Sequence, residues 1–321
     1  MGNLAIPKSA LYFLVLMLVN MMWAFQFSGA KLATERLGPI TVTTLPVVLA
    51  TLLLLPALWM ERRLTGATGW SFPTWSLRDF VLLAVFGGAP AQLGLVLGVQ
   101  HSLASNASVL TLTIPVLTAI MAALLLGEHM TLLRWFSFVL AIGGVLIVSD
   151  VDWSSLALFK ARYLTGNLLI FASCLGSAFF NSYSKKVLEH FNPVAVLTYS
   201  LSVVSLILMT LMFLFEAPSM AILGALGFES WLALGLIAVF SLALSMILFF
   251  WVIQRIDVTQ ASLSIYMLPV FGVLFSSLTL HEKIRPQLIA GGALVLVSTF
   301  LVTTYEERRM AAKNTVTKDS H

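Results

Sequence analysis

Amide, hydroxyl and indole groups recur at helical spacing inside long apolar runs of this 321-residue chain. Asn20 and Trp23 are three residues apart, so they share one face of a helix. Ser177 and Asn181 are four residues apart in a later apolar run. Uncharged polar groups of this kind can bind the polar part of a neutral or zwitterionic small molecule, so we predict all four as substrate-binding residues. The alternative is that they form hydrogen bonds between helices and only hold a bundle together.

Three further polar residues could contribute to such a site. Gln92 lies inside an apolar run and could orient an amide or a carboxylate of the ligand. Thr111 lies four residues before Pro115, and Tyr266 lies three before Pro269. A proline removes the backbone hydrogen bond to the carbonyl four residues earlier and bends the helix. We therefore predict substrate-binding positions at Gln92, Thr111 and Tyr266 and hinges at the two prolines, with fixed packing kinks as the alternative.

Charged residues are confined to the ends of the apolar runs. All 14 acidic residues fall in connections, at run ends or in the C-terminal tail. The chain therefore lacks the buried carboxylate of a proton relay and the paired buried cations that suit a phosphate. Glu128 and Glu282 each close a run, and we predict a structural role for both, as acceptors for the free N–H groups of the next helix. Lys31 and Lys185 are predicted to anchor helix ends at the membrane surface.

Residues for covalent or metal chemistry are not arranged for it. The 5 histidines and the single Cys174 show no nucleophile–base or metal-ligand spacing. We predict no catalytic residue, no metal and no cofactor, and hence a protein that is not an enzyme.

Membrane-spanning helices must position these residues. The chain is 59% hydrophobic and 10% charged, with a mean hydropathy of +0.97, whereas soluble domains carry about 25% charge. The runs are continuous and Leu-rich instead of alternating, which excludes the strands of a barrel. Runs of about 20 residues predict ten spans, near 9–30, 40–60, 79–99, 106–126, 133–150, 163–184, 194–215, 231–252, 260–280 and 286–304.

The chain repeats itself at an offset of 154 residues. Polar residues and prolines match at this offset, which chance rarely produces in apolar sequence: Lys31 and Lys185, Pro39 and Pro193, Pro115 and Pro269, and Glu128 and Glu282. Five spans per copy is an odd number, so the two copies enter the membrane from opposite sides. We predict an all-α integral membrane protein of two inverted five-helix repeats, 9–150 and 163–304, followed by a cytoplasmic tail, 305–321.

Lysine and arginine set the predicted orientation. Twelve of them fall on the side of the N-terminus and six on the other, which together make the 18 in the chain. This bias places both termini in the cytoplasm. In a membrane protein the net charge of +4 is better interpreted as this loop bias than as nucleic-acid binding, so no nucleic-acid partner is predicted. The expected partners are the lipid bilayer and a small-molecule substrate. Gly94 and Gly98 suit internal helix packing or contact with a second copy, so a monomer and a homodimer both fit.

A proline-containing span that ends in Leu124–Glu128 (LLLGE), followed by a span with Gly143 and Gly144, resembles the EamA-type branch of the drug/metabolite transporter superfamily. The second copy is similar, with His281 before Glu282 and with Gly291 and Gly292 in the last span. The resemblance covers about residues 10–305. It implies export or exchange of small metabolites such as amino acids across a bacterial inner membrane, with the substrate held between the two halves.

The sequence thus favours a secondary transporter that works by alternating access on a neutral or zwitterionic, amino-acid-like metabolite. One alternative is a non-transporting scaffold or a channel, although a channel needs a continuous polar pore or a charged ring. Another is a membrane-embedded enzyme that modifies lipid, which needs a catalytic cluster at membrane depth.

Overall fold

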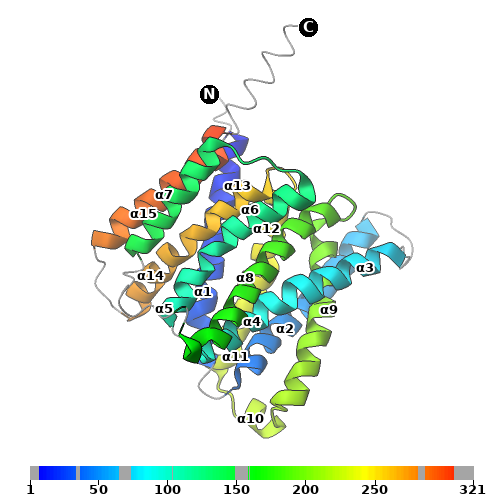
Figure 1. Ribbon diagram of the computed structural model, residues 1–321. Helices are drawn as coiled ribbons and strands as arrows, with labels where there is room; N and C mark the ends of the chain where they lie inside the picture. The colour runs from blue at the N-terminus through cyan, green and yellow to red at the C-terminus, as the bar shows by residue number, and fades with distance from the viewer. Residues whose placement is uncertain are drawn as a thin grey trace, which may run out of the picture.

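The computed structural model of the protein is a bundle of helices (Figure 1). It describes residues 7–33, 37–64, 74–102, 104–148, 158, 160–280 and 286–306. Over these residues every regular element is a helix, which confirms the predicted all-α fold class. Most of the predicted tail, residues 307–321, and Glu282 lie outside the described residues.

Each half of the chain supplies five membrane-crossing segments. In the first half these are α1 (Lys8–Ala33), α2 (Pro39–Leu64), α3 (Thr74–Leu82) with η1 (Leu83–Gly88) and α4 (Ala89–Gln100), α5 (Ala104–Thr111) with α6 (Thr113–Leu126), and α7 (Leu132–Val148). In the second half they are α8 (Ala161–Val187), α9 (Pro193–Phe215), α11 (Phe228–Leu236) with η2 (Ile237–Leu244) and α12 (Ser245–Ile253), α13 (Val258–Ser262) with η3 (Leu263–Tyr266) and α14 (Met267–Leu280), and α15 (Pro286–Phe300) with η4 (Leu301–Glu306). A short helix, α10 (Met220–Gly224), follows α9.

Ten segments match the ten predicted spans. Among the described residues, seven are long and apolar enough to cross a membrane. Two shorter apolar helices, Leu132–Ile147 and Ile289–Thr303, and the interrupted run Val258–Leu280 make up the rest. The start of α1 and the end of η4 lie at the same end of the bundle (Figure 1), as an even number of spans requires.

The two halves share one hydrophobic core. Leu16 and Val47 from the first half and Leu208 and Phe250 from the second are each at most 1% exposed and belong to one packed cluster. Burial of this apolar surface between helices positions the halves against each other.

Contacts between residues 154 positions apart mark the pseudo-twofold axis. The hydroxyls of Thr51 and Ser205 are 2.9 Å apart, joining α2 to α9. The Tyr266 hydroxyl donates to the carbonyl of Leu112 at 2.9 Å. Residues related by a twofold rotation touch each other only next to the axis. These two pairs therefore place the axis between α2 and α9 and at the breaks before the two prolines.

The helices break where the prolines predict. In the first half α5 ends at Thr111 and α6 begins at Thr113, two residues before Pro115. In the second half the helix tightens into a 3-10 turn, η3, just before Pro269. A proline cannot donate to the preceding turn, so the backbone there leaves regular α geometry.

Two wide π-helical turns, η1 and η2, begin at Leu83 and Ile237, which are 154 positions apart. Each brings its segment close to a helix of the other half. A Cβ at Gly87 would lie 3.0 Å from the Cβ of Phe180 on α8. Ser241, the counterpart of Gly87, donates to the carbonyl of Met22 on α1 at 2.6 Å. Apolar run length carries no signal for π turns, so the sequence did not predict them.

Hydrogen bonds between a carboxylate and backbone N–H groups hold α2 and α9 together at one end. The Glu216 carboxylate, just after α9, accepts hydrogen bonds from the backbone N–H groups of Ile40 and Thr41 at 2.8 and 2.7 Å. It also accepts the Thr41 hydroxyl at 2.6 Å. The first turn of a helix has no intrahelical acceptor for these N–H groups, so the carboxylate both satisfies them and interacts favourably with the helix dipole.

Substituting Glu216→Gln is expected to lower the free energy of unfolding by about 1–2 kcal/mol, because one acceptor oxygen is replaced by an amide that faces N–H donors. The measurement is thermal or denaturant unfolding of the purified protein in detergent. The matched control is Glu229→Gln: Glu229 lies in the first turn of α11, is exposed and makes no hydrogen bond with the described residues. Its expected change is below about 0.5 kcal/mol. Equal losses in both variants would mean that the contact between α2 and α9 contributes nothing.

Candidate functional site

The first wall of the candidate site is the contact between α4 and α8, which lie side by side and come from different halves (Figure 1). Glycines allow this approach. A Cβ at Gly94 would lie 2.7 Å from the carbonyl oxygen of Leu169, and one at Gly98 would lie 2.8 Å from that of Gly166. The G-x-x-x-G pattern therefore serves internal packing, one of its two predicted uses.

Gln92 belongs to α4, and Ser177 and Asn181 belong to α8. Gln92 and Ser177 are half-buried, and Asn181 is 8% exposed. None of the three side chains forms a hydrogen bond with another described residue. The Ser173 hydroxyl, one turn before Ser177, donates to the carbonyl of Ala91 at 2.7 Å, which fixes this face of α8 against the turn that carries Gln92. These two neighbouring helices thus carry three uncharged polar side chains that form no hydrogen bond with a described residue.

Asn20 has a different environment. Its side chain is 0% exposed, and its amide nitrogen donates to the carbonyl of Leu16 at 2.7 Å and to the hydroxyl of Ser264 at 2.9 Å. These bonds tie α1 to η3. The counterpart contact, 154 positions away in each case, joins the Cys174 thiol to the carbonyl of Leu110 at 3.5 Å. In this structure Asn20 follows the interhelical alternative instead of lining a wet cavity.

Trp23 lies one turn after Asn20 and is half-buried. Its ring packs against Phe249 on α12, with the ring centroids 5.3 Å apart. The indole therefore belongs to the apolar boundary between the halves. No hydrogen bond or ring contact among the described residues links it to Gln92.

Tyr266 and Thr111 lie at the broken helices. Tyr266 is 1% exposed, and its hydroxyl is held by the carbonyl of Leu112, the residue at the break itself. Thr111 is half-buried, Pro115 is buried and Pro269 is half-buried. The break between α5 and α6 is thus stabilised from the opposite half, which suits a fixed or a bistable joint better than direct binding by the Tyr266 hydroxyl.

The Glu128 carboxylate accepts N–H groups at a helix start, but not at the helix that the sequence predicts. It accepts the backbone N–H groups of Val258 and Thr259 at 2.7 and 3.0 Å and the Thr259 hydroxyl at 2.7 Å. This is the start of α13 in the other half, not the start of the following helix, α7. The reason is that α7 has an acceptor of its own, since the Thr131 hydroxyl accepts the N–H of Arg134 at 3.2 Å.

The predicted role of Lys185 as a lipid anchor is also wrong. Its ammonium group donates to Glu128 at 3.2 Å and to the carbonyl of Ile256 at 2.9 Å. The side chain is 23% exposed. Lys185 therefore joins α8 to the connection between α6 and α7 instead of extending along the membrane surface.

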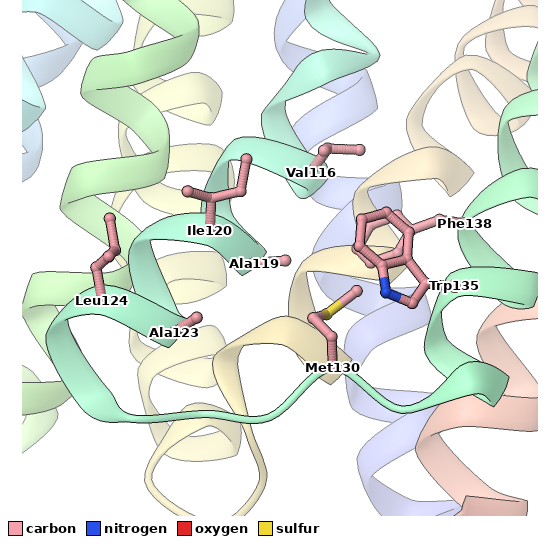
Figure 2. Close-up of a pocket in the computed structure, with 8 residues that line it drawn as sticks. All are labelled: Val116, Ala119, Ile120, Ala123, Leu124, Met130, Trp135 and Phe138. Carbon is pink, nitrogen blue, oxygen red and sulfur yellow. The ribbon is translucent and has the colours of Figure 1, made fainter.

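A cavity of about 190 Å³ opens between α6 and α7 (Figure 2). Its lining is entirely apolar and consists of Val116, Ala119, Ile120, Ala123, Leu124, Met130, Trp135 and Phe138. None of the predicted substrate-binding residues contributes to it. A zwitterionic ligand would find no hydrogen-bonding partner there, so this cavity is not the predicted site.

Comparison with known proteins agrees with the architecture. The EamA-like transporter family matches the chain twice, over residues 10–150 and 164–304. An uncharacterized transporter of Bacillus subtilis, YoaV, is 23% identical over 91% of this chain and 97% of its own length. A probable terminal-alkyne amino-acid exporter of Streptantibioticus cattleyicolor is 24% identical over 95% of this chain and 97% of its own length.

A protein of known crystal structure has the same fold. Its chain superposes with a TM-score of 0.74 at 17% identity, covering 94% of this chain and 98% of that one. The doubled family match, the two inverted sets of five segments and the apolar helices agree with one another. The chain belongs to the EamA-like transporter family and is a multi-pass membrane transporter.

Proposed function

We propose that the protein is a secondary transporter that exports or exchanges a small neutral or zwitterionic, amino-acid-like metabolite across the bacterial inner membrane. The observation that carries this proposal is that Gln92 on α4, and Ser177 and Asn181 on the adjacent α8, are polar, uncharged and without hydrogen-bond partners among the described residues. A charged amino and carboxylate pair can be bound by such groups without burial of a net charge. The similarity to a relative named as an amino-acid exporter adds support.

The proposed mechanism is alternating access around the pseudo-twofold axis. The units 9–150 and 163–304 rock against each other, with both termini in the cytoplasm and with hinges next to Pro115 and Pro269. Gln92, Ser177 and Asn181 contact the substrate directly, and Trp23 closes the apolar side. Asn20, Thr111 and Tyr266 keep the broken helices in register so that the binding groups converge.

Proteoliposome flux over a panel of amino acids tests the proposal. Transport of at least one neutral amino acid is expected in the native protein, with Asn181→Ala and Gln92→Ala lowering uptake at low substrate concentration about tenfold or more, the effect of losing a hydrogen bond to a charged group. Both variants should have the same unfolding temperature as the native protein, because neither side chain has a hydrogen-bond partner among the described residues.

Two controls separate binding from folding. Thr210→Ala should leave flux unchanged, since among the described residues this exposed hydroxyl bonds only the carbonyl of Leu206 in its own helix, at 2.8 Å. Asn20→Ala should lower stability, because it removes the link between α1 and η3. Native flux in both Asn181→Ala and Gln92→Ala would refute the site, and substrate-independent ion currents would favour a channel instead.

A further inference from the structure

Four charged side chains meet at the end of the bundle where α6, α8 and α12 finish. We call this cluster the charge latch: Glu128 and Arg134 from the first half, and Lys185 and Asp257 from the second. Lys185 pairs with Glu128 at 3.2 Å, and Arg134 pairs with Asp257 at 2.5 Å. Both ion pairs therefore join one half of the protein to the other.

The two latch residues from the first half are almost fully buried. The Arg134 side chain is 1% exposed and that of Glu128 is 6% exposed, whereas Lys185 is 23% and Asp257 38% exposed. Glu128 accepts four hydrogen bonds: two backbone N–H groups, a hydroxyl and an ammonium. Such a carboxylate is stable in this position only while the second half supplies those donors. Separation of the halves at this end must break every one of the four.

Asp257 holds the N-cap position of the helical run Val258–Leu280 yet does not cap it. Its backbone has the extended conformation of an N-cap residue, with φ −64° and ψ 143°, and aspartate is among the best residues there. Its side chain nevertheless makes no capping hydrogen bond. Instead its carboxylate pairs with Arg134 and lies 3.8 Å from Lys185. Glu128, from the opposite half, has taken its place.

We propose that these residues form a switch in which Glu128 and Asp257 exchange as the cap of the run Val258–Leu280. With this end closed, Glu128 caps the run across the interface and Asp257 is held by Arg134. When the halves separate, Glu128 leaves with the first half, and Asp257 rotates onto the N–H groups of its own helix. Lys185 stays beside Asp257, because both belong to the second half. The buried N–H groups thus keep an acceptor in both states.

This inference rests on the proposed function, since it gives alternating access a closing device at the face that we assign to the cytoplasm. It also explains why a strong N-cap residue has no capping bond. A purely structural ion-pair cluster would leave the local cap in place and use Glu128 for another contact. The exchange makes opening easier, because the loss of one acceptor is offset by another that is already one residue away.

The test measures distances between the two halves directly. Spin labels are placed through His129→Cys and Glu189→Cys, two exposed positions at the latch end of different halves, in a Cys174→Ser background. Pulsed electron resonance on the full chain in liposomes then gives the distance distribution. One dominant distance is expected for the native latch. Glu128→Gln should raise the ratio of a longer to the shorter distance about tenfold, the effect of weakening charge-assisted hydrogen bonds.

The cap exchange has its own matched pair of variants. In the Glu128→Gln background, Asp257→Asn keeps a capping side chain and Asp257→Ala does not. The ratio of the longer to the shorter distance should be about fivefold lower for Asp257→Ala than for Asp257→Asn, as loss of an N-cap predicts. Equal ratios would overturn the exchange. Lys185→Gln gives a second way to open the latch while Glu128 keeps its backbone contacts, should the Glu128 variant fail to fold.

Flux assays in the same liposomes separate the two proposals. Flux of an amino acid together with distributions that neither Glu128→Gln nor Lys185→Gln alters would overturn the latch and leave the transport function standing. Distances that respond in a protein that moves no compound of the panel would support the latch and count against the proposed substrate class.

Discussion

Gly166→Ala is expected to lower the free energy of unfolding by about 3 kcal/mol, at the upper end for an overpacked contact. A Cβ at this position would lie 2.5 Å from the backbone carbon and oxygen of His101 and 2.7 Å from the carbonyl oxygen of Gly98. All of these are backbone atoms, so no side-chain rotation can relieve the clash. Helix α8 must therefore move away from α4, so Gln92 on α4 should also change its position relative to Ser177 and Asn181 on α8. The readout is thermal unfolding in detergent, followed by flux.

The matched control for Gly166→Ala is Gly143→Ala in α7. Among the described residues, and apart from the adjacent backbone of α7 itself, no heavy atom lies within 4 Å of a Cβ built at Gly143. Alanine is also a better helix former than glycine by about 1 kcal/mol. The unfolding temperature of the control should therefore equal or exceed that of the native protein. A similar loss in both variants would show that glycine itself, and not the close approach of α4 to α8, determines stability at these sites.

The span pattern could be predicted from the sequence because it depends on run length alone. The ten segments follow from apolar runs, and the breaks follow from Pro115 and Pro269, since the effect of proline on the preceding turn is local. The inverted arrangement follows from an odd number of spans per repeat. The π turns η1 and η2 could not be predicted, because apolar run length carries no signal for them and the residues they meet belong to the opposite half: Phe180 against Gly87, and Met22 against Ser241.

The sequence did not reveal which residues of the opposite half each site residue contacts. Asn20 and Asn181 have the same residue type in equivalent apolar runs, yet Asn20 is bonded to Ser264 and Asn181 to no described residue. Only the packing of α1 on η3 makes that difference. Glu128 likewise follows the helix-end rule, but the helix it caps is 130 residues away. Spacing on one helix predicts a shared face and cannot predict what that face meets.

Arg134→Leu is expected to cost about 2–4 kcal/mol of stability. The guanidinium is 1% exposed and donates to Asp257 at 2.5 Å and to the carbonyl of His129 at 2.9 Å. Loss of one member of a buried ion pair costs about 3–5 kcal/mol, and the 38% exposure of Asp257 reduces that figure because water can solvate its carboxylate. Denaturant unfolding in detergent measures the change. Arg255→Leu is the control, because among the described residues its exposed guanidinium contacts only Trp251, four residues earlier.

A double-mutant cycle with Asp257→Asn identifies the source of the Arg134 effect. Once Arg134 is gone, the Asp257 charge has lost its nearest partner, so Asp257→Asn should cost at least 1 kcal/mol less in the Arg134→Leu background than in the native protein. The remaining cost of Arg134→Leu then comes from the other contacts of the guanidinium, the His129 carbonyl among them, and from the lost packing volume. Strict additivity would show that Arg134 and Asp257 do not interact, and the charge latch would then depend on the contacts of Glu128 and Lys185 alone.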